Sequence, residues 1–324
     1  MNLPRRKFLH LAAGAAALPL GSRIAGAQAY PSRPVRIVVG FPAGSPVDIF
    51  ARLTAQWLSE RLGQPFIIEN RVGAASNIAT EAVVRAPADG YTLLLASSAN
   101  ASNATLYEKL SFNFIHDITP VAGIARVPLV MEVHPSVPAK TVLDFIAYTR
   151  ANPGKINFAS YGNGSQTHLA GELFKMMTGV NMTHVPYGNT PPLTGIIAGQ
   201  VQVMFDGMVS SIEHIRAGSL RALAVTTAKR VEALPDIPTV DDFVPGYETS
   251  AWFGAGVPKD TPSAIIERLN REINAALVDP KIKARFAELG GTALLGSPAD
   301  LGVLIAADTE KWGKVVRSAN IKAG

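Results

Sequence analysis

Short apolar runs alternate with amphipathic stretches along most of the chain. The run Ile-Val-Val at 37–39 is followed by a stretch in which Ile49, Leu53 and Trp57 recur at four-residue spacing. An apolar run bounded by small residues is typical of a buried strand, and the four-residue spacing predicts a helix that packs this face inward. A second strand pattern follows at 65–71. The order strand, helix, strand predicts a parallel α/β sheet.

The rest of the chain continues this alternation, with breaks at clusters of Gly, Pro, Asn and Ser. We predict two α/β lobes between which the chain crosses twice, near Arg126 and Ser250. Lobe 1 then comprises residues 30–125 and 251–324, and lobe 2 comprises residues 126–250. Further strands are expected at 91–96, 118–125, 128–134, 156–160, 182–187, 201–206, 220–225 and 251–257, and further helices at 77–85, 143–151, 169–177, 191–198, 211–217, 263–278, 280–289 and 297–318.

The residues Ser45-Pro46-Val47-Asp48 predict the start of the first long helix. Serine followed three residues later by an acidic residue forms a capping box, and proline is favoured at the first helical position. The first backbone N–H groups of such a helix point back over the preceding loop, which begins at Phe41. Helix starts of this kind bind carboxylates or phosphates. An ordinary strand-to-helix turn explains this stretch equally well.

Two further loops are expected to face the same pocket. The strand at 91–96 runs into Ser97-Ser98-Ala99-Asn100, and the stretch Tyr161–His168 is a second small-residue loop that leads from a strand into a helix. Ligands of α/β sheets bind beyond the carboxyl ends of the strands, where these loops lie. We therefore expect the helix start after Ser165 to meet the first one across a cleft.

The first residues predict an export signal at 1–29. Arg5, Arg6 and Lys7 precede an apolar segment at 11–20, and Ala27-Gln28-Ala29 is a small-x-small cleavage site. The apolar segment is shorter than the about 20 residues that a membrane span needs. We expect cleavage after Ala29 and a mature protein in the periplasm. The paired arginines favour the twin-arginine route, and a general secretory signal remains the alternative.

Removal of this signal changes the charge balance. The formal net charge of the chain is +5, and the signal holds four of its 30 basic residues and none of its 25 acidic ones, so the mature chain carries +1. This balance predicts no nucleic-acid partner. The chain contains no cysteine, which excludes disulfides, thiolate metal sites and a cysteine nucleophile. The six histidines are scattered, and we expect neither a metal nor a cofactor.

Several motifs occur in an order that resembles one protein family, the Bug-type periplasmic solute receptors of tripartite tricarboxylate transporters. The resemblance covers nearly all of the mature chain. It implies a type II periplasmic-binding-protein fold, with two α/β lobes joined by a double crossover hinge. The motifs are Tyr30-Pro-Ser-Arg-Pro-Val-Arg-Ile-Val-Val-Gly-Phe-Pro-Ala-Gly44 with Asp48, Glu69-Asn70-Arg71, Ala86-Pro-Ala-Asp-Gly-Tyr-Thr-Leu93, His184-Val-Pro-Tyr187 and Gly199-Gln-Val-Gln-Val-Met-Phe-Asp206.

The same resemblance implies a function and a set of binding residues. The lobes close over a small organic carboxylate, which the receptor delivers to the permease subunits of a membrane transporter. The implied contacts are Phe41, Ala43 and Gly44 in the first loop and Gly162, Asn163 and Ser165 in the second. From the residues themselves we add Ser45, Asp48, Ser97, Asn100, Tyr187 and Asp206 as ligand-binding candidates.

This chain departs from the family pattern at two places. Ser45 stands where the family usually has a second glycine, and Ala75-Ser76 replace glycines of the usual Gly-Ala-Gly-Gly-Asn. Ser45 can cap the helix, offer its hydroxyl to the ligand or narrow the pocket. Asp48 either caps the helix or contacts the ligand, and an acid at Asp48 or Asp206 suits a ligand with an ammonium group.

Two other functions are alternatives to this one. A sensory co-receptor that presents a carboxylate to a membrane histidine kinase would have the same sequence features. A hydrolase with Ser165, His168 and Asp206 is the second alternative, but no G-x-S-x-G elbow surrounds any serine. We therefore predict that the chain is not an enzyme and has no catalytic residues, and we expect a monomer.

Overall fold

The described part of the chain begins at residue 30. A computed structural model describes residues 30–107, 109–188, 190–318 and 320–322, so the predicted export signal lies outside the described residues. From Arg33 onward the described chain forms one compact unit. Its strands are β1 Val35–Val39, β2 Phe66–Asn70, β3 Thr92–Ser97, β4 Ile118–Val133, β5 Ile156–Ser160, β6 Met182–Pro186, β7 Val203–Gly207, β8 Arg221–Val225, β9 Ser250–Pro258 and β10 Thr292–Ala293.

Helices follow most of these strands, as the sequence pattern predicts. They are α1 Pro46–Leu62, α2 Asn77–Val84, α3 Ser98–Leu106, α4 Phe114–Asp117, α5 Val142–Ala151, α6 Gln166–Thr178, α7 Leu193–Ile197, α8 Met208–Arg216, α9 Ser263–Val278, α10 Pro280–Glu288 and α11 Pro298–Ser318, with a short 3-10 turn η2 at Ala74–Ser76. Helices α3 and α4, the turn η2 and the strand β10 were not predicted. The stretch expected as a loop after Ser97 is therefore the start of a helix.

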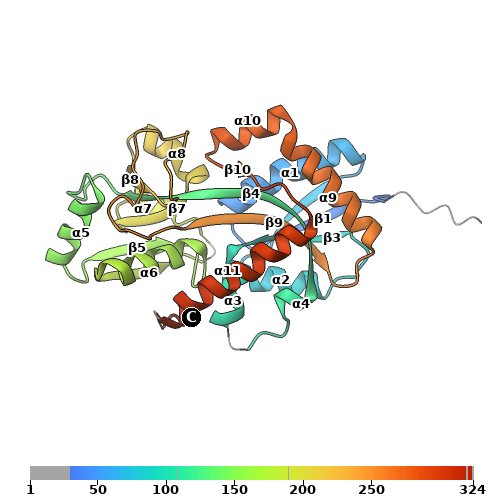
Figure 1. Ribbon diagram of the computed structural model, residues 1–324, viewed down its shortest axis with the longest axis horizontal. Helices are drawn as coiled ribbons and strands as arrows, with labels where there is room; N and C mark the ends of the chain where they lie inside the picture. The colour runs from blue at the N-terminus through green and yellow to red at the C-terminus, as the bar shows by residue number, and fades with distance from the viewer. Residues whose placement is uncertain (1–29, 108, 189, 319, 323–324) are drawn as a thin grey trace, which may run out of the picture. The chain divides into compact units, whose positions relative to one another are not determined.

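The strands form one mixed sheet in the order β2-β1-β3-β9-β4-β7-β5-β6, with β8 and β10 paired to β4 outside this path. Strand β1 pairs in parallel with β2 and β3, and β5 pairs in parallel with β6 and β7. We call β1–β3 the first strand group and β5–β7 the second strand group. The long antiparallel pair β4–β9 lies between these two groups (Figure 1).

Strand β4 corrects one prediction, because the two strands expected at 118–125 and 128–134 are a single strand. Pro128, which lacks an N–H donor, lies where the pairing of β4 changes. Up to Pro128 the strand pairs with β9, and from Leu129 it pairs with β7. Because Pro128 lies where the partner strand changes, its missing N–H does not interrupt strand β4.

The inward face predicted for helix α1 is also wrong. Ile49, Leu53 and Trp57 are only half-buried, whereas Phe50 and Leu58 are fully buried. The ring of Phe50 packs 4.6 Å from the ring of Phe286 in α10 and 5.7 Å from that of Phe253 in β9. These long-range aromatic contacts decide which apolar stripe of the helix turns inward.

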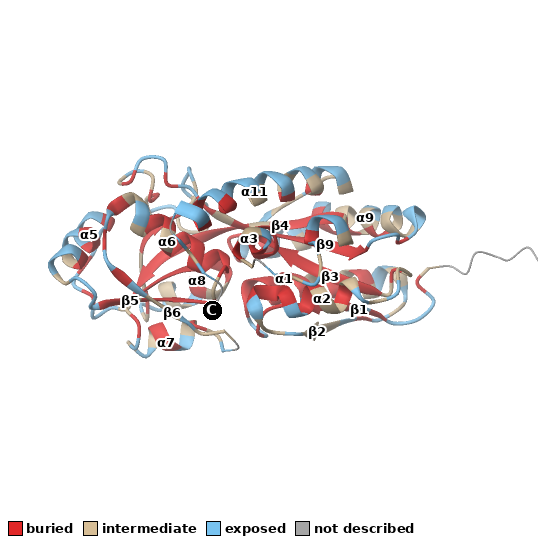
Figure 2. Cartoon of the chain, turned by 90° about the horizontal axis from the view of Figure 1, so that it is seen from below, coloured by how far each residue is buried: buried red, intermediate tan, exposed pale blue. Residues whose placement is uncertain are grey.

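Two large hydrophobic cores lie on either side of the junction between the strand groups. One contains Leu94, Trp252, Leu301 and Ile305, and the other is built around residues such as Phe174. Helix α11 contributes to both, because its later residues Trp312, Val315 and Val316 pack into the second core. Buried residues concentrate on the strands and on the inward faces of the helices, as Figure 2 shows. None of the helices in the described residues is long and apolar enough to cross a membrane.

Candidate functional site

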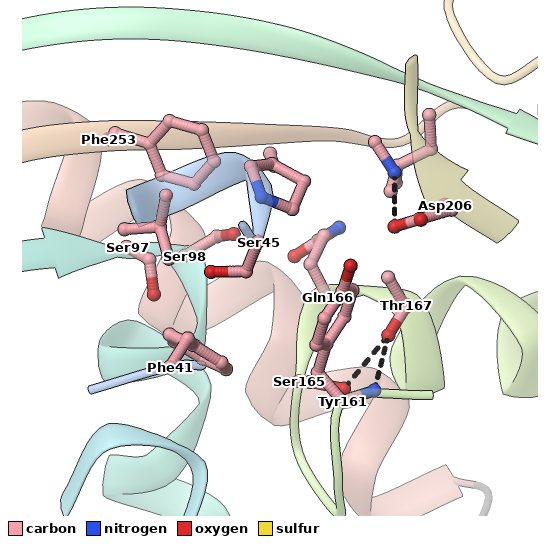
Figure 3. A pocket seen from close by; sticks show the side chains of 16 residues that line it. Phe41, Ser45, Ser97, Ser98, Tyr161, Ser165, Gln166, Thr167, Asp206 and Phe253 are labelled. Atoms are coloured by element: carbon pink, nitrogen blue, oxygen red, sulfur yellow. Dashed lines mark hydrogen bonds between the residues drawn. The ribbon is translucent and has the colours of Figure 1, made fainter. Parts of the chain in front are cut away.

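A small cavity of about 50 Å³ lies between the two strand groups. It has room for a few water molecules. The first strand group reaches it through its carboxyl-end loops, the second through the loop after β5 and the end of β7, and β4 and β9 contribute apolar side chains (Figure 3). The lining residues are Phe41, Ser45, Pro46, Val47, Ser97, Ser98, Ala99, Leu129, Tyr161, Ser165, Gln166, Thr167, Asp206, Gly207, Ala251 and Phe253.

Four helices begin at this cavity. The residues that precede α1, α3, α6 and α8 are Ser45, Ser97, Ser165 and Gly207, and all four line it. The first N–H groups of a helix lack partners within the helix, and its dipole gives the N-terminus a partial positive charge. The cavity therefore collects the positive ends of four helices, although no Lys, Arg or His is among its lining residues.

Three lining side chains carry polar atoms without a hydrogen-bond partner among the described residues. They are the hydroxyls of Ser45 and Ser98 and the side-chain oxygen of Gln166, whose amide nitrogen donates to the Thr249 hydroxyl. Ser45 and Ser98 are 1% exposed. A buried polar atom without a partner costs free energy, about 1–3 kcal/mol for a neutral group. A ligand acceptor that pairs with the Ser45 and Ser98 hydroxyls removes their cost, whereas the Gln166 oxygen requires a donor.

Asp206 is the one charged side chain among the lining residues. Its Oδ1 accepts from the backbone N–H of Gly207 at 2.7 Å, and its Oδ2 accepts from the Ser210 hydroxyl at 2.6 Å. Burial raises the pKa of Asp206 to about 6, and these hydrogen bonds oppose the rise. In Figure 3 Asp206 lies on the opposite side of the cavity from Ser45 and Ser98.

Asp48 lies outside the cavity lining and stabilises the loop before α1. It accepts from the backbone N–H of Gly44 at 2.9 Å, from Arg52 at 2.8 and 3.0 Å and from Asn70 at 2.9 Å. The capping box predicted at Ser45 and Asp48 is not formed, because the Ser45 hydroxyl makes no capping hydrogen bond and Asp48 accepts from the N–H of Gly44 instead of that of Ser45. A capping box does form at the start of α11, where Asp300 accepts from the N–H of Ser297 and the Ser297 hydroxyl accepts from the N–H of Asp300.

The predicted binding residues fall into three sets. Phe41, Ser45, Ser97, Ser165 and Asp206 are brought together at the cavity. Gly162, Asn163 and Tyr187 instead line a neighbouring hollow of about 310 Å³, which shares Phe41 and Tyr161 with the cavity. Ala43 and Gly44 are exposed on the first loop, and Asn100 accepts from the backbone N–H of Ser97 at the start of α3.

Several lining residues were not predicted. Ser98, Gln166 and Gly207 each directly follow a predicted residue, so one further step along each helix start would have found them. Tyr161 is the first residue of the second loop, and its ring meets that of Phe41 edge-on at a centroid distance of 6.4 Å. Phe253 lies in β9, and this position places its ring at the cavity.

The imagined hydrolase arrangement is not formed. The Ser165 hydroxyl donates to the carbonyl oxygen of Gly162 at 2.7 Å, and Nδ1 of His168 accepts from the backbone N–H of Gly164 at 3.1 Å. The His168 ring stacks on that of His184 at 3.8 Å. Burial lowers the pKa of His184 to about 3, with a further contribution from His168. His168 thus holds the second loop through Gly164, and its stacking on His184 fixes it against strand β6.

Comparison with known proteins agrees with this geometry. A family model described as tripartite tricarboxylate transporter family receptor matches residues 50–321. The chain is 37% identical to the protein BugT of Bordetella pertussis over 300 residues, which are 91% of this chain and 92% of BugT. It is 40% identical to a structure of R. palustris Rpa4515 with adipate, with a TM-score of 0.88 over 90% of this chain and 99% of that one. MatC (Rpa3494) from Rhodopseudomonas palustris with bound malate is 31% identical, with a TM-score of 0.84 over 89% and 100% of the two chains.

The fold is therefore the α/β fold of the periplasmic binding proteins, as predicted. The chain belongs to the receptor family of the tripartite tricarboxylate transporters, which includes Bug proteins. Members of this family are periplasmic receptors that work with membrane components of a transporter, and they are not enzymes. The predicted family and the prediction of a non-enzymatic receptor are confirmed.

Proposed function

We propose that this receptor captures a small organic carboxylate in the cavity and delivers it to the permease subunits of a membrane transporter. The observation that carries the proposal is the convergence of four helix N-termini on buried hydroxyls that lack partners. A carboxylate has only acceptor atoms, so it suits a site built from N–H and O–H donors.

The two ends of the ligand meet different surroundings in this proposal. The carboxylate accepts from the Ser45 and Ser98 hydroxyls at the starts of α1 and α3. The carbon skeleton packs against the apolar wall formed by Phe41, Leu129 and Phe253. Adipate and malate, named with the related structures, are both dicarboxylates and support this class of ligand.

We also propose that the two strand groups belong to lobes that close over the ligand. In the predicted division, α1 and α3 belong to lobe 1 and α6 and α8 to lobe 2, so a bound anion interacts with all four helix starts only when the lobes are together. A ligand that binds one conformation more tightly shifts the population toward it. The crossings near Arg126 and Ser250 fit the change of partner in β4, where Pro128 is paired with Ser250.

Export and partners complete the proposal. The signal at 1–29, cleaved after Ala29, delivers the chain to the periplasm, where it acts as a monomer. The closed form then offers its surface to the permease subunits. The residues Arg5, Arg6 and Lys7 at the start of the chain support the export step.

A thermal-unfolding screen against mono-, di- and aromatic carboxylates, with adipate and malate included, tests the function. A ligand at 100 times its dissociation constant adds about 2.7 kcal/mol to the free energy of unfolding. We expect at least one acid to raise the melting temperature of the wild-type protein. The double variant Ser45→Ala and Ser98→Ala should lose most of this rise.

The variant keeps its own stability in this proposal, because the two hydroxyls have no protein partners to lose. Ser136→Ala, on an exposed turn after β4, is the matched control and should respond to the acid like the wild type. If no carboxylate raises the melting temperature, or if the double variant responds in full, the proposed function is wrong.

A further inference from the structure

A second buried carboxyl lies beside the one in the cavity. Glu132 in β4 and Asp206 in β7 are both 0% exposed. The Ser211 hydroxyl joins them, at 2.9 Å from Oε1 of Glu132 and 3.5 Å from Oδ2 of Asp206. The other oxygen of Glu132 has no partner among the described residues. The ligand cavity is thus adjacent to a pair of acids that share one hydroxyl.

Among the described residues, no Lys, Arg or His contributes to the surroundings of Asp206. Strand β4 brings Glu132, the loop after β5 brings Tyr161, and α8 brings the hydroxyls of Ser210 and Ser211. Burial and the charge of Asp206 raise the pKa of Glu132 well above its ordinary value, and burial also raises the pKa of Asp206. A state in which at least one of the two carboxyls is protonated is therefore favoured over one in which both are ionised.

A bound carboxylate adds a further negative charge to this buried space. Charges interact several-fold more strongly in a water-excluded site than in bulk water. The start of α8 offsets part of the charge of Asp206, since the Gly207 N–H donates to it, but that donor is then not available to the ligand. A third acid without a cation is accommodated when one of the groups takes up a proton.

We propose that the receptor captures its acid together with one proton from solvent, and that the proton resides on the Asp206–Glu132 pair. This inference deepens the carboxylate function proposed above and rests on it. The receptor therefore takes up the acid with one negative charge neutralised.

The local hydrogen bonds accommodate the added proton. Asp206 already accepts from Gly207 and Ser210, with Ser211 at longer range, so a ligand ammonium is not needed to satisfy its oxygens. The Ser210 hydroxyl also lies 2.8 Å from the carbonyl oxygen of Gly207. It can donate there and accept from a protonated Asp206 in exchange. This second arrangement favours a proton over a positively charged ligand group at this position.

Isothermal titration calorimetry of the full receptor with adipate and with malate tests the proposal. Titrations at pH 7.5 in phosphate and in Tris, which differ in ionisation enthalpy, count the protons taken up. We expect close to one proton per acid bound by the wild type and an affinity that falls about tenfold per pH unit from pH 7 to 9. Asp206→Asn should bind without proton uptake, show no such decline, and bind at least tenfold more tightly than the wild type at pH 8.5.

Two further variants sharpen the test. Glu132→Gln removes the neighbouring acid, so it should reduce the proton uptake at pH 7.5 without abolishing acid binding. Asp236→Asn, at an exposed position, should behave like the wild type. The wild-type titrations decide the question even if a cavity variant does not fold.

Each remaining outcome overturns the inference. An acid that binds the wild type with no proton uptake and no pH dependence overturns proton capture alone. Loss of malate binding in Asp206→Asn without uptake in the wild type shows that ionised Asp206 binds a donor of the ligand. If neither adipate nor malate nor any other acid of the screen binds, the proposed function fails and proton capture fails with it.

Discussion

Ser45 and Asp48, three residues apart, have separate roles. The hydroxyl of Ser45 is buried at the cavity and makes no hydrogen bond to the helix, whereas Asp48 accepts hydrogen bonds from Gly44, Arg52 and Asn70. Asp48 thus holds the start of α1 alone, a role that the sequence pattern assigns to Ser45 and Asp48 together. The Ser45 hydroxyl is left available to a ligand because the Asp48 carboxylate holds the loop.

The variant Asp48→Asn tests this role through stability. Burial raises the pKa of Asp48, but hydrogen bonds from Arg52, Asn70 and Gly44 outweigh it, so the pKa lies below its ordinary value of 3.8. The stability that the carboxylate contributes is therefore present above pH 3.8 and is lost as the pH falls below it. We expect the variant to lose about 2 kcal/mol of unfolding free energy at pH 7, since Arg52 is half-exposed and screened by solvent.

Urea unfolding at pH 7 and near pH 3 measures this difference, which should shrink at the lower pH. Asp144→Asn, which removes an exposed cap of α5, is a control for a solvent-screened carboxylate and should cost less at pH 7. An equal loss for Asp48→Asn at both pH values would contradict the assigned role.

At the scale of elements, the turn η2 has a strained backbone at and next to Ala75 and Ser76, where the resemblance to the family implies glycines. Ala74, Ala75 and Ser76 have φ values of 46°, 47° and 78°, a backbone region that residues other than glycine rarely adopt. The turn packs closely on the first loop, because a Cβ added at Gly40 would lie 2.1 Å from the Ser76 hydroxyl. The two loops hold each other in place at the cost of this backbone strain.

Ser76→Gly should therefore stabilise the protein. Glycine adopts a φ of 78° without strain, and the Ser76 hydroxyl that it removes is buried without a partner. We expect a gain of about 1 kcal/mol in the free energy of unfolding, measured by urea denaturation. Ala79→Gly in the neighbouring helix α2 is the control and should cost about 1 kcal/mol. A loss of stability in Ser76→Gly would show that the side chain supports the turn.

At the scale of the whole molecule, the two sides of the cavity touch where Gly207 of β7 meets Pro46 of α1. A Cβ added at Gly207 at the end of β7 would lie 2.6 Å from the ring of Pro46, the first residue of α1. Gly207 has a φ of −61°, which any residue adopts, so an alanine there strains only this contact. Pro46 and Gly207 thus set how closely the two sides of the cavity approach.

Gly207→Ala should favour an arrangement in which the lobes are farther apart. We expect a ligand from the carboxylate screen to bind about tenfold more weakly to the variant, because closure then costs about 1.4 kcal/mol more. Calorimetry measures the affinity, and small-angle X-ray scattering measures the radius of gyration, which should shrink less on binding than in the wild type. Gly302→Ala, in α11, places its Cβ at an ordinary van der Waals distance of 3.9 Å from the ring of Pro120 and should bind the ligand normally. An unchanged affinity in Gly207→Ala would argue against closure at this contact.

The sequence by itself determined most of the order of strands and helices, the loops that lead into α1 and α6, and the family. These features depend on local spacing: the apolar runs, the small residues at Phe41–Ser45 and Tyr161–Ser165, and the serines at 45 and 165 that precede two of the helices. Five of the predicted binding residues therefore came together at the cavity without any knowledge of the tertiary structure.

Only the tertiary structure decided which helix starts share one cavity and which acids lie beside it. Gln166 meets Thr249 across 83 residues, and Ser211 links Glu132 to Asp206 across strands that pair antiparallel. Such contacts depend on strand register and on the packing of distant segments, which local patterns do not contain. For the same reason, three features differ from the sequence-based expectation. They are the buried face of α1, the continuity of β4 through Pro128 and the exposure of Ala43 and Gly44.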